Sequence, residues 1–119
     1  MKALGMIEVY GFSMAVRAAD AAAKAADVEI IAFDRNRPFG KFPVPLIIEV
    51  KMTGEVAAVE AAVEAAKAAA VAKERYIVSH VIPNPGPGVE KLAYKMDINK
   101  DKFNKKLPKS FMPADSEEE

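Results

Sequence analysis

The sequence contains no cysteine, no tryptophan and one histidine, and these absences exclude several kinds of site. Without cysteine the chain forms no disulfide, offers no thiolate to zinc or to an iron–sulfur cluster, and has no thiol nucleophile. His80 alone does not supply the several imidazoles of a histidine-based metal centre. We therefore expect no metal, no other cofactor and no catalytic residue, which points away from an enzyme.

An excess of charge of either sign is also missing, because 17 basic side chains are matched by 17 acidic ones. A nucleic-acid-binding domain usually carries a basic excess, so we expect no nucleic-acid partner. Charged residues interrupt every apolar run before it reaches the roughly 18 residues of a membrane span, so we expect no membrane partner. A chain of 119 residues is long enough for one domain with one core.

What the sequence has in abundance is alanine, most of it in two blocks that favour slim helices. We expect these helices over residues 14–26 and 55–74, with Ser13 and Thr53 as N-caps. Between and around them, apolar and β-branched residues predict strands. The expected strands cover residues 3–9, 28–33, 46–52 and 76–82.

The resulting order, β-α-β-β-α-β, is the signature of a ferredoxin-like α+β fold. It predicts a four-stranded antiparallel sheet with both helices on one face. A short C-terminal helix is expected over residues 89–96, which completes a domain of residues 1–96. Residues 97–119 are rich in charge and poor in apolar side chains, and we expect them to form a mobile tail.

Residues 34–43, between the second and third expected strands, contain two prolines and one glycine and therefore predict a long loop. Three basic residues against one acidic residue give the loop a net charge of +2, and two phenylalanines lie among them. In a single copy this pattern is typical of a solvated loop. In a ring the positive charge is repeated around one axis, where it favours anions.

Two other features have simpler explanations than a site. His80 lies within the fourth expected strand without a recognisable nucleophile or carboxylate partner, which favours a hydrogen-bonded structural histidine over a general base. Residues 97–101 imitate the start of a calcium loop, but Lys102 and Pro108 occupy the positions that require glycine and glutamate. We interpret this stretch as a solvated charge run.

Four motifs, in the same order along the chain, resemble those of bacterial microcompartment shell proteins, the BMC-domain family. They are the first strand, the alanine-rich first helix with the start of the second strand, the entry into the second helix, and the fourth strand with its exit. The matching residues are 3–8, 18–26, 28–29, 53–59 and 79–83. The resemblance covers about residues 3 to 90, and its single domain is similar to the hexamer-forming subunits.

The resemblance implies a structural protein that performs no bond chemistry. Such proteins form flat homohexamers that tile with other shell proteins into the facets of a polyhedral shell in the bacterial cytoplasm. The shell encloses enzymes, and metabolites cross it through a pore on the six-fold axis. Six copies of the loop imply a pore that prefers anionic metabolites. The expected pore-lining residues are Arg35, Asn36, Arg37, Pro38, Phe39, Gly40, Lys41 and Phe42.

At the outer edge of the ring, Lys24 matches the lysine that meets its counterpart from a neighbouring hexamer. Asn84 stands where the family usually has an arginine, and asparagine lacks the reach and the fixed donors of that side chain. This departure predicts weaker tiling. The alternative to a shell protein is a ferredoxin-like regulatory module, such as a PII-like trimer, with the basic loop as its binding element. An acylphosphatase-like enzyme requires a cation after the first strand, and residues 10–13 have none.

Overall fold

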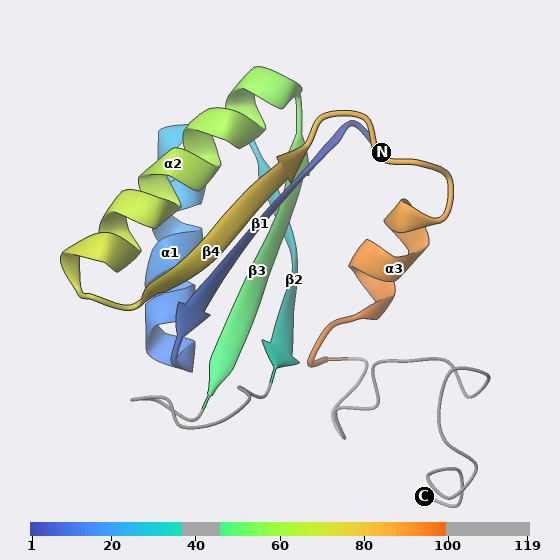
Figure 1. The fold of residues 1–119 in the computed structure, drawn as a ribbon. Helices are drawn as coiled ribbons and strands as arrows, with labels where there is room; N and C mark the ends of the chain where they lie inside the picture. Colours follow the sequence, from blue (N-terminus) through green and yellow to red (C-terminus); the bar gives the residue numbers. More distant parts are fainter. Residues whose placement is uncertain (37–45, 100–119) are drawn as a thin grey trace, which may run out of the picture.

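The computed structural model describes residues 1–36 and 46–99, in which the expected order of elements is confirmed. The described chain has four strands, two long helices and a short third helix, and Figure 1 labels each of them. The elements are β1 (Ala3–Tyr10), α1 (Phe12–Ala25), β2 (Glu29–Asn36), β3 (Ile47–Gly54), α2 (Val56–Ala72), β4 (Tyr76–Ile82) and α3 (Val89–Lys95).

The strands form one sheet in the order β2-β3-β1-β4, and each neighbouring pair is antiparallel. This topology confirms the ferredoxin-like α+β prediction. Strands β1 and β2 run in the same direction, so both begin at one end of the sheet and finish at the other. We call these two ends the edge end and the loop end. At the loop end, β2 ends at Asn36 opposite Ile47 of β3. At the edge end, β4 ends at Ile82 opposite Leu4 of β1, and α1 ends nearby as the chain enters β2.

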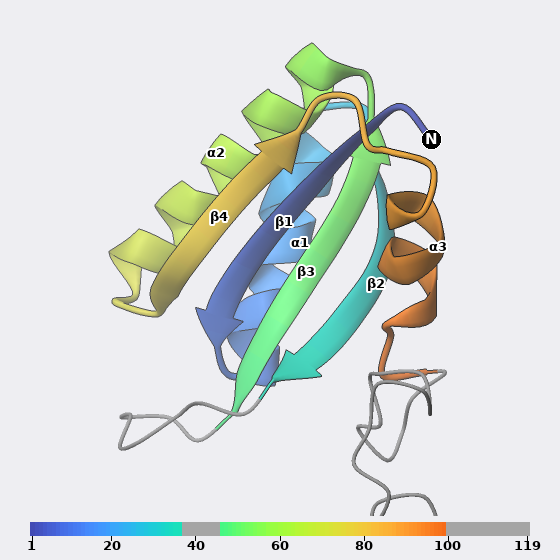
Figure 2. The same ribbon diagram turned by 45° about the vertical axis from the view of Figure 1, so that its right-hand side comes forward.

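One face of the sheet, the helix face, holds the core. Helices α1 and α2 cover this face of the sheet (Figure 2). Alternate residues of β1 and β3 pack there against alanines and valines of the two helices. Gly5 shows how closely α2 approaches, since a Cβ added there lies 2.6 Å from Val59 Cγ1 and 2.9 Å from Val63 Cγ2. The small side chains of both layers therefore allow a tight helix–sheet contact, as the alanine content predicted.

The opposite face, called here the free face, meets α3 through a buried lysine. The Lys51 ammonium donates hydrogen bonds to the carbonyl oxygens of Ala93 (3.2 Å) and Met96 (2.6 Å) at the end of α3. It also lies 3.9 Å from the Asp34 carboxylate, and both residues are buried. A cation near the C-terminal carbonyls of a helix is favourable, so Lys51 fixes α3 against the sheet.

Both predicted N-caps are wrong. Helix α1 begins at Phe12, with Gly11 as its N-cap at a φ of 89°, a conformation that glycine adopts without steric cost. Helix α2 begins after Glu55, because Thr53 still belongs to β3 and its hydroxyl donates a hydrogen bond to the Ala3 carbonyl at 2.7 Å. Ser13 lies inside α1, so the local pattern placed the start of this helix too late. Thr53 lies within β3, so the pattern placed the start of α2 too early.

The boundaries around β2 also differ from the prediction. Residues 34–36, assigned to the loop, extend β2 and pair with β3 up to Ile47. On the outer edge of β2, the Ile98 amide donates to the Phe33 carbonyl at 2.8 Å, and the Phe33 amide donates to the Asp97 carboxylate at 3.4 Å. Asp97 is buried, so its interpretation as part of a solvated charge run is wrong.

The described helices include none with the length and hydropathy of a membrane span.

Candidate functional site

The residues expected to line a pore and those expected at a ring edge lie at opposite ends of the sheet. Arg35 and Asn36 are the last two residues of β2, at the loop end. Lys24 lies in the last turn of α1 and Asn84 follows β4, both at the edge end (Figure 1). Because each strand has seven or eight residues at about 3.3 Å each, roughly 25 Å separates the two ends.

At the loop end, the register places the two described pore candidates on different faces. Arg35 is paired with Ile48, whose side chain belongs to the core of the helix face. Asn36 is paired with Ile47 and therefore points to the free face. Both are half-buried. The other predicted pore residues, in the range 37–42, lie outside the described residues, so the pore lining stays a prediction.

At the edge end, Lys24 is exposed and paired within its own helix. Its ammonium lies 2.9 Å from the Asp20 carboxylate one turn earlier. The hydrogen bond and the negative charge of Asp20 favour the protonated amine and raise the pKa of Lys24 above the ordinary lysine value. An exposed pair of this kind contributes little to stability. Its effect is on Lys24 itself, which keeps its charge and is held in place by Asp20.

Asn84 lies in a proline-rich connection between β4 and α3, where its side chain is exposed. The surrounding prolines fix the backbone locally, which presents the amide to solvent without a helix or strand around it. The topology brings the ends of α1 and β4 to the same end of the sheet, so Lys24 and Asn84 share it.

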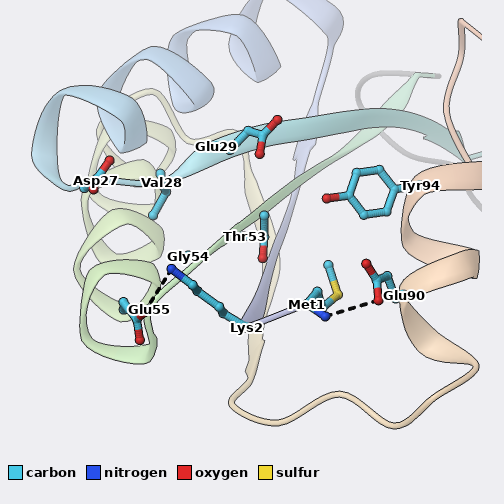
Figure 3. Close-up of a pocket in the computed structure, with 10 residues that line it drawn as sticks. All are labelled: Met1, Lys2, Asp27, Val28, Glu29, Thr53, Gly54, Glu55, Glu90 and Tyr94. Atoms are coloured by element: carbon cyan, nitrogen blue, oxygen red, sulfur yellow. Dashed lines mark hydrogen bonds and ion pairs between the residues drawn. The ribbon is translucent and has the colours of Figure 1, made fainter.

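A pocket of about 380 Å³ also opens at the edge end, between the sheet and α3 (Figure 3). Four carboxylates line it, and two of them form ion pairs: Glu55 with Lys2 at 3.0 Å and Glu90 with the Met1 amino group at 3.1 Å. The other two carboxylates belong to Asp27 and Glu29. This lining is acidic, so the pocket does not suit the anions expected at the loop end.

His80, for which the sequence favours a structural role over that of a general base, has an exposed side chain on β4. The prediction of a structural histidine is wrong, because the His80 side chain lies in solvent on the edge strand β4 and not in the core. Within residues 1–36 and 46–99, no group of three or more acidic, histidine or cysteine side chains is arranged to hold a metal ion. Sequence reasoning missed the buried pair of Lys51 and Asp34, in which Lys51 also donates hydrogen bonds to the end of α3.

The chain is similar in sequence to one family of known proteins. The family profile of the BMC domain matches residues 3–85. A curated protein from Citrobacter freundii, bacterial microcompartment shell protein PduA, is 38% identical over 94 residues, which cover 79% of this chain and 94% of that protein. Bacterial microcompartment shell protein EutM from Salmonella typhimurium is 34% identical over 102 residues, which cover 83% of this chain and 99% of its own.

A solved structure agrees with these sequence matches. The crystal structure of a microcompartment protein from Desulfitobacterium hafniense DCB superposes with a TM-score of 0.64 at 31% sequence identity. The match covers 76% of this chain and 48% of that chain, so the chain spans about half the length of its structural neighbour. Fold, sequence and the order of motifs therefore lead to the same family.

Proposed function

This chain belongs to the BMC-domain family and is a shell subunit of a bacterial microcompartment, and from this premise we propose that it forms cyclic homohexamers with a central pore. The hexamers tile with other shell proteins into facets around enclosed enzymes in the bacterial cytoplasm. The protein acts by assembly and selective passage, without catalysis of its own.

The observation that carries this proposal is the separation of the two candidate regions along the sheet. With the loop end at the ring axis, six copies bring Arg35 and the basic residues that follow it around one opening. The same orientation turns Lys24 and Asn84 outward, where neighbouring rings meet. A ring with the opposite orientation surrounds its axis with the acidic pocket of Figure 3 and buries Lys24.

The pore is proposed to favour anionic metabolites, because repeated positive charge raises the local concentration of anions. The test compares the flux of a small dicarboxylate with that of a neutral molecule of equal size across sheets of the assembled protein. Neutral substitutions of Arg35, Arg37 and Lys41 to glutamine, one at a time, should slow the anion and leave the neutral molecule unchanged. Lys91→Gln, on the exposed face of α3, is the charge-matched control. Equal loss in the control contradicts the pore proposal.

The edge is proposed to tile weakly because Asn84 replaces the family's arginine. Lys24→Ala should keep the ring intact, because the side chain is exposed and makes no contact with the core. The substitution should abolish ordered sheets in electron micrographs, because it removes the lysine that is proposed to meet the neighbouring ring. Asn84→Arg should instead increase sheet size, because guanidinium supplies five donors in a fixed geometry. Sheets that respond to neither substitution contradict the assignment of this edge.

A further inference from the structure

The free face of the sheet carries a groove that the shell proposal does not use. In Figure 2, α3 stands beside β2, while β4 and β1 have no helix of the described chain in front of them. A hollow of about 200 Å³ lies between α3 and the floor formed by Leu4 and Met6. A second hollow of about 60 Å³ continues over β1 and β4 and shares Met6 and Glu49 with the first.

The walls of this groove are apolar and partly exposed. Leu92 of α3 is 46% exposed, and Val78 of β4 is 50% exposed on the other side. Leu92 lines the first hollow and Val78 lines the second, so each hollow has an exposed aliphatic side chain at its rim. Apolar surface that remains exposed on both sides of a groove favours an occupant that carries apolar side chains of its own.

The floor is acidic. The strand registers place Asp34 opposite Glu49, and Glu49 opposite Glu8, so that three carboxylates form one row across β2, β3 and β1. Side chains paired in this way lie about 5 Å apart. Lys51 is the one cation among the described residues that line the two hollows, which gives this lining a charge of −2. These carboxylates have contacts within the fold, and their row still makes the groove negative.

The chain leaves the described structure next to this row. Lys51 holds the end of α3, and the hydrogen bond from the Ile98 amide to the Phe33 carbonyl keeps the following residues on β2. Residues 100–112 then contain five lysines and one aspartate, together with Phe103, Leu107, Phe111 and Met112. This segment therefore combines the positive charge and the apolar side chains that the groove lacks.

We propose that residues 100–112 bind in the groove of their own subunit, with the lysines near the carboxylate row and the apolar side chains against Leu92 and Val78. The distance is short, because four strands span about 15 Å and 13 extended residues reach about 40 Å. Attachment through Asn99 gives the segment an effective concentration in the millimolar range, which favours binding within the subunit over binding between subunits. The negative groove repels phosphates and nucleic acids, so it excludes those occupants.

The absence of cysteine in the chain makes a direct test possible. Val78→Cys places one thiol in the groove, and Ser110→Cys places another in the segment; both are made in the full-length protein. The control pairs Ser110→Cys with Ala57→Cys, an exposed position on α2 on the other side of the sheet. Under mild oxidation, we expect the groove pair to form its disulfide at least about tenfold faster than the control pair.

Non-reducing gels identify the source of the segment, because an internal disulfide gives a compact monomer and a disulfide between subunits gives a dimer. In 0.5 M salt the advantage of the groove pair should shrink severalfold, because exposed charges are screened beyond a few ångströms. The same loss is expected without salt when four lysines of the segment become glutamine. These are Lys102, Lys105, Lys106 and Lys109.

Three results overturn the proposal. Equal rates for the groove pair and the control pair mean that the segment does not bind the free face. Dimers in place of compact monomers mean that a neighbouring copy provides the segment. An advantage that survives both salt and the glutamine substitutions means that charge does not select the groove. The proposal itself does not depend on the ring, since the disulfide that it expects forms within one subunit.

Discussion

Lys51 is the residue whose removal tests the described packing most sharply. It donates two hydrogen bonds to the end of α3, to Ala93 and Met96, from a side chain that is 5% exposed. Hydrogen bonds from a charged group contribute about 1.5–3 kcal/mol each. Since the two carbonyls regain water when the lysine is replaced, we take about 3 kcal/mol as the loss for Lys51→Met.

The expected result is a local one. A loss of about 3 kcal/mol in the free energy that holds α3 corresponds to roughly 100-fold faster amide exchange in this helix, because 1.4 kcal/mol is a factor of ten. Hydrogen exchange followed by mass spectrometry on a peptide spanning residues 89–98 measures it. Lys91→Met, on the exposed side of the same helix, should leave the exchange rate unchanged.

A double variant separates the two consequences of losing Lys51. The single variant also leaves the buried Asp34 carboxylate without this cation, which destabilises the whole fold. Lys51→Met with Asp34→Asn should therefore recover part of the global stability but not the slow exchange of α3. If α3 exchanges at the wild-type rate in Lys51→Met, the account of how this helix is held is wrong.

Two further predictions concern packing and charge. Gly5→Ala should destabilise the fold by about 1–3 kcal/mol in denaturant unfolding, because its new Cβ lies 2.6 Å from Val59. Gly86→Ala, with no atom within 4 Å of its Cβ, should have no such effect, and equal losses contradict the packing argument. Asp20→Asn should lower the pKa of Lys24 in an NMR titration. Since the pKa of Lys24 is raised in the wild type, the pair stabilises α1 at neutral pH and loses this contribution as the pH rises through that pKa. An unchanged pKa of Lys24 in Asp20→Asn contradicts the role of this pair.

The fold was predictable because its signals are local and repeat along the chain. Two alanine blocks and four apolar segments define the element order, and that order leaves few topologies. The helix starts were less predictable, because more than one residue near each start can cap a helix. At α1 the backbone freedom of Gly11 decided the start, and Ser13 fell inside the first turn.

The environment of the free face was not predictable from sequence. Lys51 alternates with apolar neighbours in β3, a pattern that indicates a solvated side chain. Its burial depends on α3, which reaches it from more than 40 residues later in the chain. An even longer separation of 64 residues, between Asp97 and Phe33, hid the burial of Asp97 against β2. His80 was misjudged for another reason, because the sequence does not show which strand is at the edge.

Native mass spectrometry of the assembly decides whether the subunits form a closed ring of six. Six copies of the 12.9 kDa chain give about 77 kDa, the value expected for a closed ring. A mass of three copies contradicts the ring and favours the regulatory module considered from the sequence. A single-copy mass leaves no axis around which Arg35 and the basic loop can gather, and therefore contradicts the proposed pore.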